Sequence, residues 1–272
     1  MKRIALLRTS LLAAMACTLA VAGAAHASPE SQAARFADYG TPGVWLTKHE
    51  DGTTHEVLAD ASPDAARRPA SSIKPLLALI ALETGALAGG DEEVPWDGRA
   101  YPNFPHWEQA STLTEAMASS SESYFRTLAT RIGRDTLAEW VARVDYGNGM
   151  LGAQAENAWH DGVLLITPRQ QLAFADRLRR GDLPFAPQHM ATVREAMRGG
   201  DVDGTAVYGK TGTGLRRGDH AGVGWYVGWT EGGATDAAFV LMVALEDSID
   251  GRDRRVRLAH QLLRDTVQAP TR

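Results

Sequence analysis

The chain has 272 residues, of which 44% are hydrophobic, and its formal net charge is -5 at pH 7. This length and composition suit one large globular domain, or two lobes that share a cleft, with a sizeable apolar core. The acidic balance and the scattered lysines and arginines offer no basic surface for nucleic acid, so we expect no nucleic-acid partner.

The first 27 residues have the pattern of a secretory signal peptide. Lys2 and Arg3 precede an apolar run, and Ala25-His26-Ala27 is a small-x-small cleavage pattern. We therefore assign residues 1–27 to a signal peptide and residues 28–272 to a single domain that is periplasmic or secreted. The unbroken apolar run is shorter than the roughly 20 residues of a spanning helix, so no stable membrane insertion is expected after signal removal. A retained membrane anchor is the alternative.

The only cysteine, Cys17, lies inside this predicted signal peptide. The mature chain would then form no disulfide and use no cysteine nucleophile. A lipoprotein attachment at Cys17 is an alternative, but the preceding residues Ala14-Met15-Ala16 lack the usual leading leucine. The eight histidines show no metal-ligand spacing, so we predict no metal site.

Local patterns predict the secondary structure in chain order. Alternation around a turn predicts an early antiparallel hairpin with strands at 44–46 and 53–58. A helix is expected to begin at or near Ser71 and to end at Gly85. Helical spacing follows at 113–132, 134–144 and 167–178. Strands at hairpin spacing come next, at 207–208, 223–229 and 238–245, and a last helix covers 253–267.

Strand hairpins at both ends of the chain thus enclose a helical middle. The fold class is therefore predicted as α+β. We expect one antiparallel sheet built from both chain ends, flanked by terminal helices, with an inserted mainly helical lobe.

Ser71 and Lys74 lie three residues apart at the expected helix start, so their side chains face the same way on its first turn. A serine hydroxyl becomes a good nucleophile only when a neighbour takes its proton, and a lysine can do this when burial or modification lowers its proton affinity. Free N–H groups at a helix start also suit developing negative charge. The motif alone is weak, because an N-capping serine before a surface lysine has the same spacing.

A second motif, Lys210-Thr211-Gly212, lies in an expected strand among small residues. Lysine supplies positive charge and threonine a hydroxyl, which suit a substrate carboxylate, and glycine lets the backbone approach a ligand closely. By itself the triplet also describes a solvated lysine in a turn. In this order, with a helical segment between them, the two motifs are far more specific than either alone.

Together these motifs resemble the class D (oxacillinase-type) serine β-lactamases, within the superfamily of penicillin-binding proteins and β-lactamases. The resemblance runs over nearly the whole mature chain. The segments that carry it are Pro69-Ala70-Ser71-Ser72-Ile73-Lys74, Trp96-Asp97-Gly98, Trp107, Tyr146-Gly147-Asn148, the spaced set Trp159, Gly162, Leu164, Ile166, Thr167 and Gln171, and Gly224-Trp225-Tyr226-Val227-Gly228-Trp229.

The resemblance implies a small-molecule β-lactam substrate, a penicillin-type antibiotic whose lactam carbonyl acylates Ser71. Lys74 would be carboxylated by carbon dioxide and act as general base in acylation and deacylation. Trp159 would donate its indole N–H to this carbamate. Ser120 and Lys210 complete the implied catalytic set. No metal or cofactor is implied beyond that carboxylation, and the implied role is antibiotic resistance.

Substrate binding is implied for a second group of residues. Thr211, Gly212 and Thr213 would lie along the substrate, and the backbone N–H groups of Ser71 and Thr213 would form the oxyanion hole. An arginine at the start of the last helix would help to hold the substrate carboxylate. Arg255 aligns best with this role, and Arg254 is next.

Two positions depart from the family pattern. The S-x-V element aligns with Ser120-Ser121-Glu122, so a glutamate replaces the apolar residue beside Lys74. An ion pair there would favour the ammonium form of Lys74, which cannot add carbon dioxide. Lys74 would then stay unmodified with Glu122 as proton acceptor, or turnover would be slow. Alternatively, Glu122 turns outward to solvent and the site works as in the family.

The second departure is Pro75, which directly follows Lys74, one position earlier than is usual. A proline disfavours helical geometry in the residue before it.

Two other functions suit the same motifs. A slow or inactive penicillin-binding member of the family would acylate without turning over. A D,D-peptidase or transpeptidase would act on cell-wall peptides with the same serine, lysine and K-T-G arrangement. The mature size and the Y-G-N and W-x-x-G elements favour the lactamase.

Overall fold

The computed structural model describes residues 29–233, 236–245 and 252–267. The predicted signal peptide at 1–27, with Cys17, lies outside these ranges. No helix in the described ranges combines the length and the apolar character that crossing a membrane requires.

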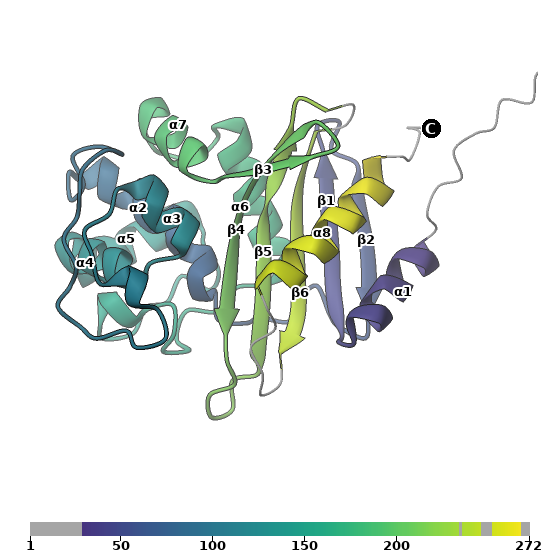
Figure 1. The fold of residues 1–272 in the computed structure, drawn as a ribbon, viewed down its shortest axis with the longest axis horizontal. Helices are drawn as coiled ribbons and strands as arrows, with labels where there is room; N and C mark the ends of the chain where they lie inside the picture. The colour runs from purple at the N-terminus through teal and green to yellow at the C-terminus, as the bar shows by residue number, and fades with distance from the viewer. Residues whose placement is uncertain (1–28, 234–235, 246–251, 268–272) are drawn as a thin grey trace, which may run out of the picture.

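A six-stranded antiparallel sheet forms the centre of the molecule (Figure 1). Its strands lie in the order β2-β1-β6-β5-β4-β3. They are β1 (Gly43–His49), β2 (Thr54–Ala59), β3 (Arg198–Val202), β4 (Thr205–Gly214), β5 (Gly222–Glu231) and β6 (Ala237–Leu245). β1 pairs with β6, with Trp45 opposite Leu241, so both ends of the chain meet inside one sheet, as the sequence predicts.

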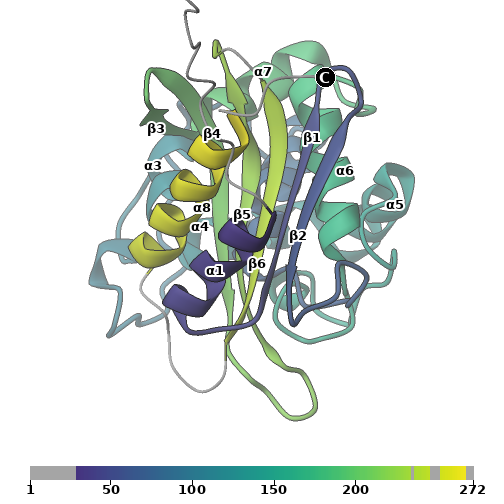
Figure 2. The same cartoon turned by 90° about the vertical axis from the view of Figure 1, so that its right-hand side faces the viewer.

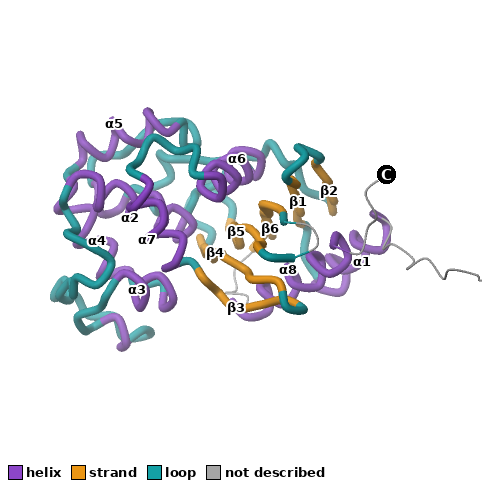
Figure 3. Tube along the Cα trace, turned by 90° about the horizontal axis from the view of Figure 1, so that it is seen from above, coloured by secondary structure: helices purple, strands orange, loops and turns teal. Residues whose placement is uncertain are grey.

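Helices cover both faces of this sheet and form a lobe beside it. They are α1 (Pro29–Tyr39), α2 (Lys74–Thr84), α3 (Leu113–Ser119), α4 (Glu122–Ile132), α5 (Arg134–Val144), α6 (Pro168–Arg180), α7 (Pro187–Ala196) and α8 (Arg252–Val267). α1 and α8 lie on one face and α6 on the other (Figure 2). The lobe of α2 to α5 lies beyond the β4 side of the sheet (Figure 3). The predicted α+β class with an inserted helical lobe is confirmed.

α2 is apolar on all sides because it runs through the middle of the helical lobe. Its residues from Lys74 to Leu82 are all buried, and it packs against α4 and α7. The helix predicted at Ser71 begins as a 3-10 helix, η1 (Ala70–Ile73), and α2 itself starts at Lys74. Pro75 therefore lies in the first turn of α2, where backbone N–H groups have no partner within the helix and a proline costs little.

The single helix predicted over 113–132 is wrong, because the chain forms α3 and α4 with a break between them. Ser120 ends α3 in the left-handed conformation, with φ of 57°. The Ser121 hydroxyl then accepts a hydrogen bond from the Tyr124 N–H and caps α4. The apolar residues of both helices are buried in the same core. Their helical period therefore continues across the break, and the sequence pattern does not reveal it. The break brings the Ser120 hydroxyl to Lys210 of β4.

Candidate active site

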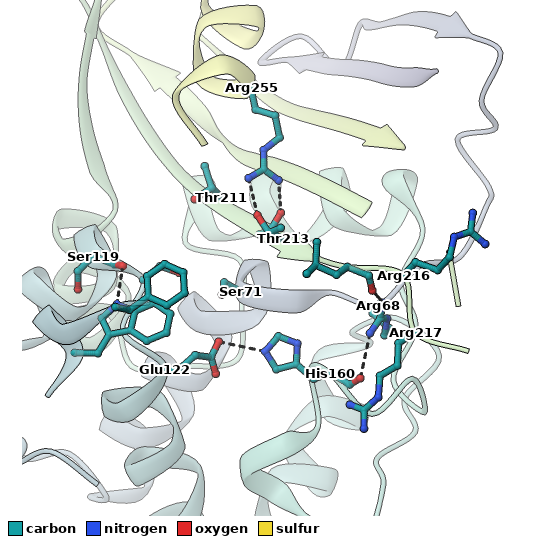
Figure 4. A pocket seen from close by; sticks show the side chains of 15 residues that line it. Arg68, Ser71, Ser119, Glu122, His160, Thr211, Thr213, Arg216, Arg217 and Arg255 are labelled. Carbon is teal, nitrogen blue, oxygen red and sulfur yellow. Dashed lines mark hydrogen bonds and ion pairs between the residues drawn. The ribbon is translucent and has the colours of Figure 1, made fainter. Parts of the chain in front are cut away.

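A pocket of about 530 Å³ opens between β4 and the helical lobe (Figure 4). Its lining includes Ser71, Ser120, Glu122, His160, Thr213 and Arg255. Lys74 and Lys210 are buried behind this lining, and both contact Ser120. The fold therefore gathers side chains from η1, α4, β4 and α8, which lie far apart in the sequence.

Ser71 follows Ala70, which holds a left-handed backbone conformation with φ of 49°. For a residue other than glycine this conformation costs on the order of 1–3 kcal/mol and persists only where the surroundings hold it. The Ala70 N–H donates to the Trp159 carbonyl at 3.2 Å, and the Trp225 indole N–H donates to the Arg68 carbonyl at 2.9 Å. These contacts fix the chain just before the serine and set the position of Ser71 in the pocket.

Gly212 lets β4 approach η1 closely. A methyl group at this position would lie 2.8 Å from the Ser72 nitrogen and 3.0 Å from the Pro69 carbonyl oxygen, and both are backbone atoms. The backbone cannot yield to such a contact unless β4 moves away from the turn that carries the serine. The glycine of the K-T-G element therefore keeps Thr211 and Thr213 beside Ser71 in the pocket lining.

Ser120 links the two lysines of the site. Its hydroxyl oxygen lies 3.3 Å from Lys74 Nζ and 2.9 Å from Lys210 Nζ, and its carbonyl accepts a further hydrogen bond from Lys74 Nζ at 2.8 Å. Both lysines are buried, with 0% of Lys74 and 3% of Lys210 exposed. The structure thus brings together three residues that the resemblance places in one catalytic set.

Glu122 turns inward, so the alternative in which it faces solvent is wrong. Its Oε1 atom lies 3.2 Å from Lys74 Nζ, and its Oε2 atom lies 3.0 Å from Trp159 Nε1. His160 Nε2 lies 3.2 Å from the same Oε1 atom (Figure 4). One carboxylate therefore contacts three nitrogen groups, and only 14% of its side chain is exposed.

Charge and burial oppose each other in the pair of Lys74 and Glu122. Burial lowers the pKa of Lys74 below its usual value, and the Glu122 carboxylate offsets only part of that effect. Burial also opposes ionisation of Glu122. The Lys74 charge and the His160 hydrogen bond outweigh this and hold the pKa of the Glu122 carboxyl well below its usual range. Beside a charged Lys74, Glu122 is therefore an anion, while burial works against the charge on Lys74.

This geometry does not suit a carboxylated Lys74. The Trp159 indole N–H, which the resemblance assigns to a carbamate, donates to Glu122 instead. A carbamate would also place a second negative charge beside that of Glu122. The residues around Lys74 thus already supply one carboxylate, and it belongs to Glu122.

The arginine beside the K-T-G strand is Arg255, which comes from α8. Its guanidinium donates to the Gly212 carbonyl and to the Thr213 hydroxyl, both at 2.6 Å, and the side chain is buried (Figure 4). Arg254 points elsewhere, because it contacts the carbonyl and the ring of Tyr39 in α1. α8 therefore brings Arg255 to the pocket and leaves Arg254 outside it.

The Y-G-N element braces the loop that carries Trp159. The Asn148 amide donates to the Val163 carbonyl at 2.9 Å, and its side-chain oxygen accepts the Leu165 N–H at 3.2 Å. Gly147 has a positive φ of 64°, and a methyl group there would lie 2.3 Å from the Leu165 carbonyl oxygen. These contacts support the site from outside the pocket.

His160 and Phe104 are among the pocket residues that no sequence motif marks. His160 contacts Glu122 and lines the pocket, and its place directly after Trp159 is the one signal in the sequence. Phe104 at the pocket stacks on Trp107, with ring centroids 4.2 Å apart. Across the part of the chain that the structure describes, no three His, Cys, Asp or Glu side chains gather as a metal site would need.

Known proteins resemble this chain in sequence. The family model of the penicillin binding protein transpeptidase domain matches residues 19–265. The regulatory protein BlaR1 of Bacillus licheniformis is 34% identical over 179 residues, which is 65% of this chain. The probable beta-lactamase YbxI of Bacillus subtilis (strain 168) is 32% identical over 180 residues, which is 66% of this chain. The chain spans 29% of the length of BlaR1 and 65% of the length of YbxI.

The fold also matches solved structures. The class D β-lactamase YbXI from Nostoc superposes with a TM-score of 0.79 at 27% sequence identity. The match covers 86% of this chain and 98% of the Nostoc chain, so it includes both the sheet and the helical lobe.

Proposed function

The chain belongs to the penicillin-binding protein transpeptidase family, in the group that includes the class D β-lactamases, and we propose that it hydrolyses penicillin-type β-lactams through an acyl-enzyme on Ser71. One observation carries this proposal, which is that Ser71 lines a pocket in which Ser120 joins two buried lysines. A basic group beside a serine is what makes its weak hydroxyl a nucleophile.

Acylation begins when the Ser71 hydroxyl oxygen attacks the lactam carbonyl carbon. Lys74, whose burial favours the neutral amine, takes the hydroxyl proton. The Ser120 hydroxyl, between Lys74 and Lys210, passes a proton to the lactam nitrogen as the amide bond breaks. The backbone N–H groups of Ser71 and Thr213 stabilise the oxyanion.

Two forms of the base would lead to the same products. In one form, carbon dioxide carboxylates Lys74 and the carbamate activates the hydrolytic water, as the resemblance implies. In the other form, Lys74 stays an amine with Glu122 as its partner. The hydrogen bonds between Trp159 and Glu122 favour the second form.

A stopped-flow assay of the mature protein with a chromogenic β-lactam tests the proposed function. We expect a burst of one product per protein and then sustained turnover, with no loss of rate when a chelator is added. One β-lactam per protein should appear as a covalent adduct in the intact mass spectrum. If neither burst nor adduct forms, the chain does not use a β-lactam acyl-enzyme. The predicted signal peptide also leads us to propose export, so the activity should be found in the periplasmic or secreted fraction.

A penicillin receptor that acylates and holds its ligand is a second candidate function. The similarity to the regulatory protein BlaR1 and to the solved C-terminal domain of the Bacillus licheniformis BlaR penicillin receptor favours it. A receptor would give the same covalent adduct and the same burst. It would not give sustained turnover. The steady-state rate after the burst therefore separates a hydrolase from a receptor.

Replacement of Arg255 should weaken substrate binding more than chemistry. Its guanidinium lies at the pocket beside Thr213 and offers positive charge to a substrate carboxylate. We expect Arg255→Ala to raise KM about 10-fold or more, because a hydrogen bond to a charged group contributes about 1.5–3 kcal/mol. Steady-state kinetics measure this effect, and Arg254→Ala is the matched control from outside the pocket. Equal KM values for both variants and the wild type would remove Arg255 from carboxylate recognition.

A further inference from the structure

We propose that Glu122 permanently supplies the carboxylate that carboxylation of Lys74 would otherwise add, so that Lys74 and Glu122 together form a base that needs no carbon dioxide. This rests on the proposed function, because it concerns the base of the same reaction. Its starting point is the direction of the Glu122 side chain, which reaches Lys74 at 3.2 Å where the family pattern has an apolar residue.

Glu122 occupies the donor that a carbamate would need. Trp159 is fully buried, and its indole nitrogen carries a single N–H. That N–H donates to Glu122, with Nε1 at 3.0 Å from Oε2 and 3.3 Å from Oε1. His160 approaches the same carboxylate from the pocket side. The donor that the resemblance assigns to a carbamate is therefore already bonded to Glu122.

Charge also favours one carboxylate here over two. The Lys74 ammonium and the Glu122 carboxylate attract each other across 3.2 Å. Addition of carbon dioxide to Nζ would replace the positive charge with a negative one and turn this attraction into repulsion. Carboxylation of Lys74 would thus destroy its ion pair with Glu122.

The pair can take up one proton, as a carbamate does. With Lys74 neutral, the pair carries one negative charge, which is on Glu122. After proton uptake Lys74 is an ammonium, Glu122 is still an anion, and the pair is neutral. Burial favours the first state by lowering the pKa of Lys74, and the ion pair stabilises the second.

Deacylation then needs no further group. Glu122 and Ser71 line the same pocket, so the carboxylate and the acyl ester share one space that water can enter. The water oxygen bonds to the ester carbon while Glu122 takes the water proton and passes it to the Lys74 amine. The bond from that carbon to Ser71 Oγ then breaks, and the proton returns to Ser71 Oγ. The products are the free serine and the ring-opened acid.

The first test measures the state of Lys74 directly. Wild-type protein is stripped of carbon dioxide and then supplied with 13C-labelled bicarbonate, and 13C NMR detects any carbamate. We expect no carbamate signal, and a turnover rate that is the same before and after bicarbonate is added. A carbamate signal would overturn the proposal, as would activity that is lost on stripping and returns with bicarbonate.

The second test removes the charge of Glu122. In Glu122→Gln we expect acylation to continue and deacylation to fall about 100-fold or more, within the usual contribution of a general base. The acyl-enzyme should then accumulate in the intact mass spectrum, and the rate after the burst should fall. Glu139→Gln, on the exposed face of α5, is the matched control. A Glu122→Gln protein that deacylates at the wild-type rate would refute the role of Glu122.

The third test restores the apolar residue of the family pattern. Glu122→Val frees the Trp159 N–H and removes the competing charge, so this variant should gain a carbamate signal and a turnover rate that depends on bicarbonate. If Glu122→Val is folded by circular dichroism and shows no carbamate, Glu122 is not what excludes carboxylation and the proposal is wrong. Failure of the proposed function gives a different result from failure of this proposal. In that case the wild type forms no β-lactam adduct, whatever the NMR shows.

Discussion

Ser71→Ala should abolish β-lactam turnover and covalent labelling. We expect a fall in turnover on the order of 10⁶-fold, as when the nucleophile of another serine hydrolase is removed. Two other hydroxyls at the pocket already have contacts of their own. The Ser120 hydroxyl lies between two lysines, and the Thr213 hydroxyl accepts a hydrogen bond from Arg255. Intact mass spectrometry after incubation with a penicillin measures the labelling.

Ser72→Ala is the matched control for this variant. The Ser72 hydroxyl donates to the Pro69 carbonyl at 2.6 Å and accepts from the Gln171 amide at 2.6 Å, and Ser72 does not line the pocket. Loss of this acceptor should cost about 1–3 kcal/mol of stability, yet the adduct should still form. An adduct of one β-lactam on Ser71→Ala would mean that another residue is the nucleophile.

The sheet could be predicted because its local signals agree with its packing. β5 and β6 are apolar runs, and nearly all of their residues are buried. The edge strand β3 could not be predicted in this way. It contains Gly199 and Gly200, and four of its five residues are exposed, so neither alternation nor apolar content marks it. Its pairing with β4 alone defines it as a strand.

The active site was predictable where its chemistry is local in sequence. The spacing of Ser71 and Lys74 needs only a helical turn to bring the side chains together. The direction of Glu122 needs more, because a glutamate in the first turn of a helix is an ordinary surface residue near the positive end of the helix dipole. The Glu122 side chain points inward because it contacts Lys74 and also Trp159, which lies in a loop 37 residues further along the chain. Contacts of this range leave no periodic signal in the sequence.

The sequence alone also could not decide which of the neighbouring residues Arg254 and Arg255 reaches the pocket. Adjacent residues on a helix point about 100° apart, since 3.6 residues complete one turn. A shift of one residue in an alignment therefore decides whether an arginine reaches the pocket. The packing of α8 against the sheet settles this in favour of Arg255.

Lys74→Met should lower the acylation rate about 10²–10⁴-fold, the usual contribution of a general base. Methionine is unbranched, apolar and one heavy atom shorter than lysine, so packing at the buried start of α2 is largely retained. What is lost is the amine that contacts Ser120 and that we propose as the acceptor of the Ser71 proton. Time-resolved adduct formation in the mass spectrometer measures the acylation rate.

The same variant should also be less stable, because Glu122 loses its counter-charge. Removal of one partner from a fully buried ion pair costs about 3–5 kcal/mol. Glu122 is 14% exposed and keeps its contacts with Trp159 and His160. We therefore expect a smaller loss of about 1–3 kcal/mol, as for a buried polar group that loses a partner.

The double variant Lys74→Met/Glu122→Val separates catalysis from stability. Removal of both charges leaves neither unpaired, so the free energy of unfolding should return to within about 1 kcal/mol of the wild type, since apolar replacement of a buried ion pair is often neutral. Acylation should not return, because the base is still absent. Chemical denaturation and adduct formation are measured on the wild type, both single variants and the double variant. If acylation recovers together with stability, Lys74 acts through the fold and not as the base that activates Ser71.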